Sequence, residues 1–261
     1  EDSPTIWKPI DVSGLTFGNN GFYLDYEASD NLGNDANGGT DWAEANLAAT
    51  DQATDTPTNN FCTLNPLFGT TGRTFSEGNT HYVYDDNWHK ATTSTIAVTA
   101  GKWYYEFRNE TDTPIEVAVC NGTIANNGIW GTSTVRDAGT YSLRQSNDAI
   151  TWHTNSSTGN LMQNGSNIRT DLAQLGTGEI GMFAFDCATG KIWTGTNNTW
   201  DNSGDPAGDS NPSTTWSTNF TAGELTWFAF GSEGNADLKV NFGNPSWAIS
   251  SSQADENGYG N

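Results

Sequence analysis

The sequence predicts an all-β protein built as an antiparallel β-sandwich. Short runs rich in aromatic and β-branched residues recur along the chain, and clusters of Gly, Asn, Ser, Thr and Asp separate them. Aromatic residues make up 12% of the 261 residues and include eleven tryptophans, so these runs can supply a core although the hydrophobic fraction is only 34%. Many short strands with little helical periodicity are typical of two packed antiparallel sheets.

The first part of the chain, residues 1–80, is expected to be a loop-rich extension that packs on the sandwich. Within it, the apolar runs at 21–26 and 61–64 predict short strands. Residues 42–49 are compatible with one short helix, for which Asp41 is a candidate N-cap.

The second part, residues 81–261, is expected to form the sandwich. Its strongest strand is predicted at 102–108, where Trp103, Tyr105 and Phe107 alternate along the chain and should face the core. Further strands are predicted at residues 81–84, 93–99, 114–120, 140–143, 150–153, 180–185, 191–194, 225–230 and 238–242. The sequence has no internal repeat and no charged linker that would indicate a further domain boundary.

Residues 180–194 predict a hairpin whose turn contains Gly190, a residue free to adopt a positive φ. The pleat places Phe183 and Phe185 on one face of the first strand and Met182 on the other, so both faces must be covered. The side chains expected inside the sandwich are those of Trp103, Tyr105, Phe107, Phe183, Phe185 and Phe228.

The charge balance narrows the range of partners. Ten basic residues stand against thirty-one acidic ones, which gives a net charge of −21. Binding to nucleic acid needs clusters of Lys and Arg, and so does binding to an anionic membrane surface, so neither partner is expected. No apolar run is long enough to span a bilayer as a helix. The surface suits solubility, including in salty water that screens self-repulsion.

The three cysteines, Cys62, Cys120 and Cys187, lie far apart in the sequence. None is part of a C-x-x-C pair, so the spacing does not predict a zinc site. We expect buried free thiols, with a Cys120–Cys187 bridge as the alternative that the sequence leaves open.

The sequence predicts no catalytic residue. It has only three histidines and lacks the common nucleophile, zinc-protease and phosphate-loop motifs. A glycosidase on a sandwich scaffold needs two carboxylates about 5–10 Å apart. Glu106 and Glu110 are the nearest such pair, and the segment at Glu110 already resembles a turn.

One Gly-rich loop is a candidate calcium site, and no other cofactor is expected. Asp35, Asn37 and Asp41 place alternating oxygen side chains in this loop, as calcium favours. The EF-hand pattern is not met, because the twelfth position from Asp35 is Asn46. Asx turns without a metal ion are the alternative.

Aromatic side chains in loops are candidates for stacking on sugar rings. Trp130, Trp200 and Trp216 lie in turn-rich segments, so they are the tryptophans expected to be exposed and to bind a ligand. The alternative for each is a structural role, in which the indole packs under its own loop.

Four segments of the chain follow in order a pattern known from one family. They are residues 101–107 (Gly-Lys-Trp-Tyr-Tyr-Glu-Phe), 114–121 (Pro-Ile-Glu-Val-Ala-Val-Cys-Asn), 179–193 with its Asp-turn-Gly hairpin, and 238–243 (Leu-Lys-Val-Asn-Phe-Gly). Together they resemble the SPRY (B30.2) domain over roughly residues 90–250, although 117–119 lacks the glycine usual in that strand. The resemblance implies a concanavalin-like jelly-roll sandwich that works by binding and not by catalysis.

The flanking segments are similar to another group of proteins. Residues 16–22, 54–61 and 200–207 look like segments found with a SPRY-like region in marine phage structural proteins, such as tail or fibre components. The chain begins at Glu1 without Met and ends at Asn261, where those relatives typically continue. The resemblance therefore implies a fragment of a longer virion protein.

We therefore expect a non-enzymatic protein of the virion surface or extracellular space, which attaches to a host glycan or protein or docks on a neighbouring subunit. A homo-oligomer is expected, since the lead-in with Ile6, Trp7 and Ile10 can reach another copy. Two alternatives stay open. One is a self-assembling subunit of a capsid or filament, and the other is a carbohydrate-active enzyme.

Overall fold

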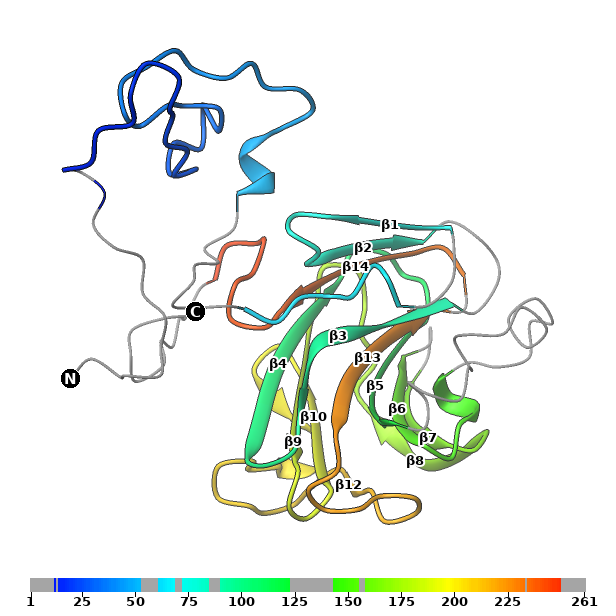
Figure 1. Ribbon diagram of the computed structural model, residues 1–261. Coiled ribbons are helices and arrows are strands. Elements are labelled where there is room, and N and C mark those ends of the chain that lie inside the picture. The colour runs from blue at the N-terminus through cyan, green and yellow to red at the C-terminus, as the bar shows by residue number, and fades with distance from the viewer. Residues whose placement is uncertain are drawn as a thin grey trace.

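The structure is a computed structural model, and it describes residues 12, 14–52, 61–68, 72–84, 90–122, 143–154, 158–232 and 234–249. Over these residues the chain forms two antiparallel sheets that pack face to face (Figure 1). The predicted all-β antiparallel sandwich is therefore confirmed.

The first sheet has eight strands. Their order across the sheet is β1 (Arg73–Ser76), β2 (His81–Tyr84), β14 (Ala236–Asn241), β4 (Lys102–Asn109), β9 (Ile180–Asp186), β10 (Lys191–Thr196) and β11 (Thr199–Trp200), with β12 (Thr214–Thr215) also paired to β10. Strands far apart in sequence, such as β2 and β14, thus lie side by side, so most of the pairing is non-local.

The second sheet has six strands. Their order is β3 (Lys90–Val98), β13 (Thr226–Ser232), β5 (Ile115–Asn121), β6 (Ala149–Thr154), β7 (Gly159–Gln163) and β8 (Ser166–Leu172). The described part of the chain also has three short 3-10 turns, η1 (Ala49–Asp51), η2 (Leu143–Gln145) and η3 (Asp201–Ser203).

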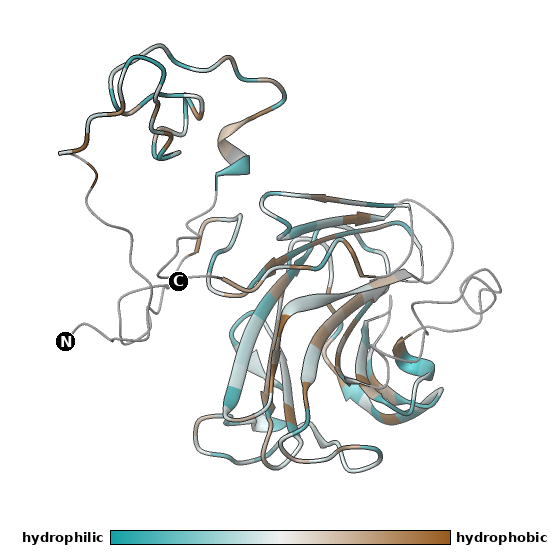
Figure 2. Cartoon of the chain, viewed as in Figure 1, coloured by the Kyte–Doolittle hydropathy of each residue, from teal (hydrophilic) through white to brown (hydrophobic). Residues whose placement is uncertain are grey.

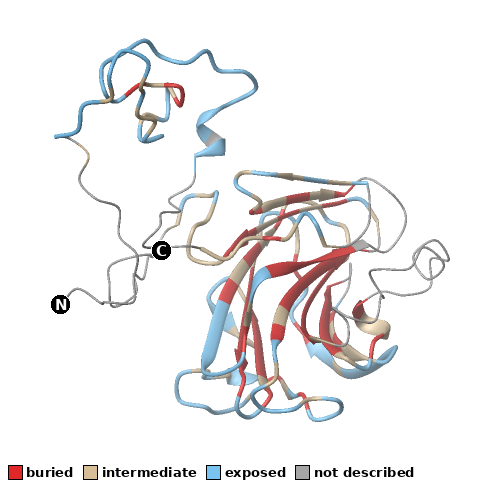
Figure 3. Ribbon diagram, viewed as in Figure 1, coloured by how far each residue is buried: buried red, intermediate tan, exposed pale blue. Residues whose placement is uncertain are grey.

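Aromatic rings fill the space between the sheets. The ring of Tyr105 packs against Phe228 at 4.6 Å and Phe183 at 5.3 Å between centroids. Most of the buried residues lie on the strands of the two sheets (Figure 3), and these strands carry much of the apolar sequence (Figure 2). The prediction that Tyr105, Phe107, Phe183, Phe185 and Phe228 are inside is confirmed. Met182, on the opposite face of β9, is covered as well.

The prediction for Trp103 is wrong, because 44% of this residue is exposed. The alternation along β4 is correct, since Tyr105 and Phe107 are buried. Trp103, however, lies one residue after the strand begins, and its indole N–H donates to the carbonyl of Ala100 at 2.7 Å. It packs back over the turn that precedes β4, at the margin of the core.

The short helix expected at 42–49 is also absent, and only its last residue belongs to η1. Asp41 does not cap a helix. Its Oδ1 accepts from the backbone N–H of Asp35 and its Oδ2 accepts from the side-chain amide of Asn31. The carboxylate therefore closes a loop instead of starting a helix.

The residues before β2 divide into two kinds. Residues 14–52 are loop-rich and are drawn beside the sandwich in Figure 1. Leu64, in contrast, is fully buried in the core and pairs with Ser94, and β1 is a strand of the first sheet. The sandwich thus includes residues that precede position 81. No helix in the described ranges is long and apolar enough to cross a membrane.

All three cysteines are free thiols in the structure. Burial raises the pKa of Cys120 on β5 to about 12 and that of Cys187 to about 11. Burial raises the pKa of Cys62 as well. These groups are therefore protonated at neutral pH, and a thiol is a much weaker nucleophile than a thiolate.

Candidate functional site

The outer face of the first sheet carries a group of aromatic and polar side chains around Tyr104 and Glu106 of β4. Because the side chains of a strand alternate, the burial of Tyr105 and Phe107 sends Tyr104 and Glu106 to the opposite, outer face. The strand pairing places Met182 of β9 beside Glu106 on this face. The core packing thus fixes which β4 side chains face outward.

Glu106 is held by two side-chain donors. The hydroxyl of Tyr104 donates to Oε1 at 2.6 Å, and the amide of Asn241 on β14 donates to Oε2 at 3.1 Å. Asn241 is itself oriented, because its Oδ1 accepts from the backbone N–H of Gly243 at 2.8 Å. Burial, the hydrogen bond to Glu106 and the charge of that carboxylate raise the pKa of Tyr104. The hydroxyl therefore stays protonated and remains a donor.

Trp200 completes the aromatic part of this face. It lies on β11 opposite Gly195 of β10, and Gly195 lies opposite Met182 on the other side. The rings of Trp200 and Tyr104 meet edge to face at 5.9 Å between centroids. Tyr104 remains 49% exposed, whereas Met182 is buried. The two rings thus lie at the surface, whereas the neighbouring Met182 side chain is covered.

Position 195 must be glycine because Met182 and the backbone of β11 pack closely around it. A Cβ there would lie 2.6 Å from the methyl carbon of Met182 and 2.5 Å from the carbonyl oxygen of Thr199. Any larger residue would push Met182 or β11 away, and with β11 the ring of Trp200. The local sequence therefore sets the position of Trp200 relative to Tyr104.

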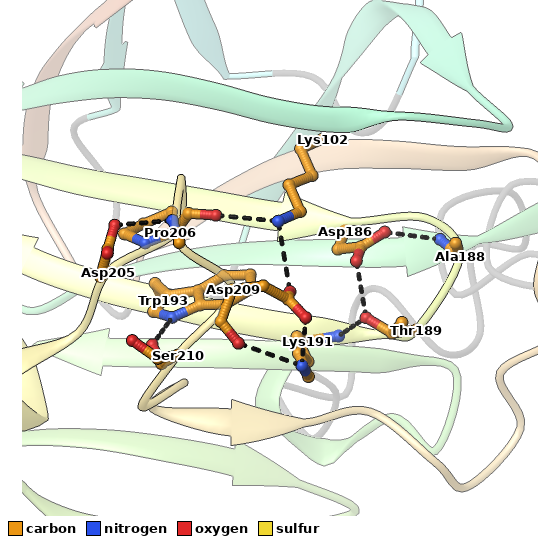
Figure 4. Close-up of polar contacts among 11 residues, drawn as sticks. Lys102, Asp186, Ala188, Thr189, Lys191, Trp193, Asp205, Pro206, Asp209 and Ser210 are labelled. Atoms are coloured by element: carbon orange, nitrogen blue, oxygen red, sulfur yellow. Dashed lines mark hydrogen bonds and ion pairs between the residues drawn. The ribbon is translucent and has the colours of Figure 1, made fainter.

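The loop between β11 and β12 borders the site and is tied to the sheet (Figure 4). The carboxylate of Asp209 pairs with Lys191 at 2.6 Å and with Lys102 at 3.2 Å. These lysines lower the pKa of Asp209, with Lys191 the larger cause. The indole N–H of Trp193 donates to the carbonyl of Ser210 in the same loop at 2.8 Å. Both lysines are thus paired with a carboxylate of the same chain.

The three predicted ligand-binding tryptophans have different outcomes. Trp200 is partly exposed at the site described above. Trp216 is only 1% exposed, so its expected exposure is wrong. It packs against Phe220 at 5.3 Å between centroids, and its indole N–H donates to the carbonyl of Thr218. Trp130 lies outside the described residues.

The candidate calcium residues lie in one loop, in which the carboxylates of Asp35 and Asp41 accept hydrogen bonds from neighbouring residues. Oδ1 of Asp35 accepts from the N–H groups of Tyr23 and Asn37. Asp41 in turn binds Asp35 and Asn31, and the N–H of Asp35 lowers its pKa most. The contact from the Asn37 N–H to Asp35 is the Asx type of the metal-free alternative.

Within the described ranges, no group of three or more His, Cys, Asp or Glu side chains is arranged to hold a metal ion. Calcium binding at Asp35, Asn37 and Asp41 stays a prediction.

The sequence pattern assigned Tyr104 no role and suggested Glu106 only as one carboxylate of a possible glycosidase pair, not as part of a binding site. The signal was present in the alternation of residues 102–108, which places both side chains opposite the core. The other acidic residue considered for catalysis, Glu110, follows β4 and pairs with Arg108 at 3.4 Å.

No protein-family model and no curated protein matches the chain. Among solved structures it is similar to the TRIM65 PSpry domain, with 12% identity and a TM-score of 0.49 over 69% of this chain and 91% of that one. It is also similar to the SPRY domain of human HERC1, with 13% identity and a TM-score of 0.44 over 68% of this chain and 96% of that one. The strand pairing of this chain shows the sandwich fold by itself, independently of these similarities.

Proposed function

We propose that this chain is a non-enzymatic binding subunit of a virion surface appendage, such as a tail fibre. In this proposal the sandwich attaches to a host-surface glycan or protein, and the N-terminal region docks on a neighbouring subunit. The similarity of residues 16–22, 54–61 and 200–207 to phage structural proteins supports the virion setting. The protein then works at the virion surface, outside the cell.

The observation that carries this proposal is the concentration of exposed apolar side chains in residues 14–52. Five large ones are about half exposed there, namely Leu15, Phe22, Tyr26, Trp42 and Leu47. Leu32 is the only buried large apolar residue among these positions. So small a core gives little stability by itself, and a high share of exposed apolar side chains in one segment is typical of a region that contacts a partner.

Polar contacts give residues 14–52 a defined shape despite the small core. The backbone N–H of Tyr23 donates to Asp35, and that of Gly33 donates to Glu44 at 2.8 Å. The rings of Phe22 and Trp42 meet edge to face at 4.9 Å. An apolar surface held in one shape loses less conformational entropy when a partner binds.

The charge of this region favours a protein partner over nucleic acid or an anionic membrane. Residues 14–52 contain no Lys, Arg or His. They contain seven acidic residues, which are Asp25, Glu27, Asp30, Asp35, Asp41, Glu44 and Asp51. We propose that the partner is another copy of the chain, so that the protein is a homo-oligomer. The lead-in with Ile6, Trp7 and Ile10, expected to take part in this contact, lies outside the described residues.

A self-assembling subunit of a capsid or filament is the second candidate. The same exposed apolar residues favour it, because they serve subunit contact whether or not the sandwich binds a host. The two candidates differ in the sandwich, which binds a ligand only in the first.

The proposal is tested by measuring the mass of the intact chain in solution by light scattering. We expect a multiple of 28.1 kDa for the natural sequence and a monomer for the double variant Phe22→Ser, Trp42→Ser. The matched control is Ile168→Ser, which changes an exposed apolar residue of β8 and should leave the mass unchanged. A monomeric natural chain, or a double variant that still assembles, contradicts the proposed docking role.

A further inference from the structure

We propose that Tyr104, Glu106 and Trp200 form a binding site for a neutral sugar ring on the outer face of the first sheet. This inference rests on the proposed function and names the ligand class through which the sandwich would attach. Its basis is one juxtaposition. Two aromatic rings in edge-to-face contact lie at the surface beside a carboxylate that two side chains hold in place.

A pyranose has the chemistry that complements this arrangement. One face of a sugar ring presents C–H groups, and its edge presents hydroxyls. Aromatic faces such as those of Tyr104 and Trp200 suit the C–H groups, while a carboxylate accepts hydroxyl donors. Sites for small ligands commonly combine an apolar surface with a few placed polar groups, as here.

Glu106 has remaining capacity to accept hydrogen bonds. An ionised carboxylate offers about four lone-pair positions on its two oxygens. Tyr104 donates to one oxygen and Asn241 to the other. The Tyr104 hydroxyl can also accept a hydrogen bond while it donates to Glu106. Two adjacent acceptors thus face a ligand that carries several hydroxyl donors.

The charge around the site selects a neutral sugar. Glu106 is acidic, and the whole chain carries a net charge of −21. Lys102 of β4 and Lys191 of β10, which contact the bordering loop, both pair with Asp209 of that loop. A sulfated sugar or a uronic acid would therefore be repelled by the carboxylate, with these two lysines already engaged elsewhere.

The site is preorganised. Trp200 is placed by the β10–β11 pairing and by the packing around Gly195, and Glu106 is placed by Asn241. Groups already fixed in the free protein lose little conformational entropy when a ligand binds.

The test uses the intact chain and a panel of immobilised neutral, sulfated and uronic-acid oligosaccharides, followed by calorimetry with the best neutral binder. We expect binding to neutral members, weakened about tenfold or more by Tyr104→Ala and by Trp200→Ala. Tyr104→Phe, which keeps the ring but removes the hydroxyl, and Glu106→Gln should each weaken it several-fold.

The matched control is Trp103→Ala, which removes an exposed aromatic residue from the neighbouring position of β4 and should leave binding unchanged. Circular dichroism melting of each variant shows that the sandwich remains folded. Binding that survives both Tyr104→Ala and Trp200→Ala, a preference for the anionic oligosaccharides, or no neutral binder in the panel overturns the proposal.

This failure is distinguishable from failure of the proposed function. If the chain assembles through Phe22 and Trp42 but binds no neutral sugar, the sugar site is wrong and the subunit role remains. If the natural chain is a monomer that binds neutral sugars through Tyr104, the sugar site stands and the docking role fails.

Discussion

Gly181 of β9 shows how a single residue permits the aromatic core. It lies opposite Phe107 of β4, and a Cβ at this position would be 2.2 Å from Cζ of the Phe107 ring. Phe107 is fully buried and packs against Trp152 at 5.5 Å between centroids, so the ring has little room to move. The absence of a side chain at 181 is therefore a packing requirement of the sandwich.

We expect Gly181→Ala to lower the free energy of unfolding by about 1–3 kcal/mol, the usual cost of overpacking a core. Urea denaturation followed by tryptophan fluorescence measures the change. Gly234→Ala is the matched control, since its Cβ would lie at an ordinary 3.6 Å from Thr113 Cγ2. Equal stability of the two variants would show that Phe107 repacks freely.

At the scale of elements, two polar side-chain contacts tie β14 to β2 and to the turn that precedes β2, although the two strands are 152 or more positions apart in sequence (84 to 236). Lys239 Nζ lies 2.9 Å from Glu77 Oε1, and His81 Nε2 lies 2.7 Å from Asp237 Oδ1. Burial alone would raise the pKa of Glu77. Hydrogen bonds from Ser246 and Lys239, with the positive charges of Lys239 and His81, outweigh burial and lower it.

A lowered carboxyl pKa gives the sign of the pH dependence. The stabilisation from Glu77 is present above its ordinary pKa of 4.5 and is lost as the pH falls through the lower, folded-state value. We expect Lys239→Met to lower the stability at pH 7 by about 1 kcal/mol, because the pair is only partly shielded from water. The loss should shrink below pH 4.5.

Urea denaturation of both proteins between pH 3 and pH 7 measures this difference. Lys102→Met is the control, because Lys102 and Asp209 are both more than two-fifths exposed and their pair should contribute less. A Lys239→Met deficit that stays constant as the medium becomes acidic would assign the effect to packing of the lysine stem instead of its charge.

At the scale of the whole molecule, the charge imbalance sets the response to salt. Thirty-one acidic side chains against ten basic ones produce repulsion across the surface, and residues 14–52 add seven acids without a base. Salt shortens the distance over which charges interact, from about 30 Å at 0.01 M to about 8 Å at 0.15 M. Screening should therefore favour both the folded chain and contact between copies.

We expect the Tm to rise by several degrees between about 0.01 M and 0.5 M NaCl, and the share of oligomer to rise with it. Differential scanning calorimetry and light scattering on the same samples measure the two effects. KCl at matched ionic strength is the control for ion-specific binding and should give the same rise. A Tm that falls with salt would mean that attractive ion pairs outweigh the net repulsion.

The sequence by itself determined the fold class and most of the core. Alternation is a local property of a strand, so it correctly placed Tyr105, Phe107, Phe183 and Phe185 inside and implied that Met182 needs cover. The turn at Gly190 was also predicted correctly, because the positive φ of 70° at this position favours glycine.

The tertiary structure alone decided which side chains are exposed at the margins of the sandwich and which meet across strands. Trp103 alternates like a core residue yet lies where β4 begins, and Trp216 follows a loop yet is covered by Phe185 and Phe220. Likewise, Tyr104 and Trp200 are 96 positions apart (200 − 104) and meet only because β4, β9, β10 and β11 pair in one register. Burial and contact depend on what the rest of the chain lays over a residue, which a local pattern does not contain.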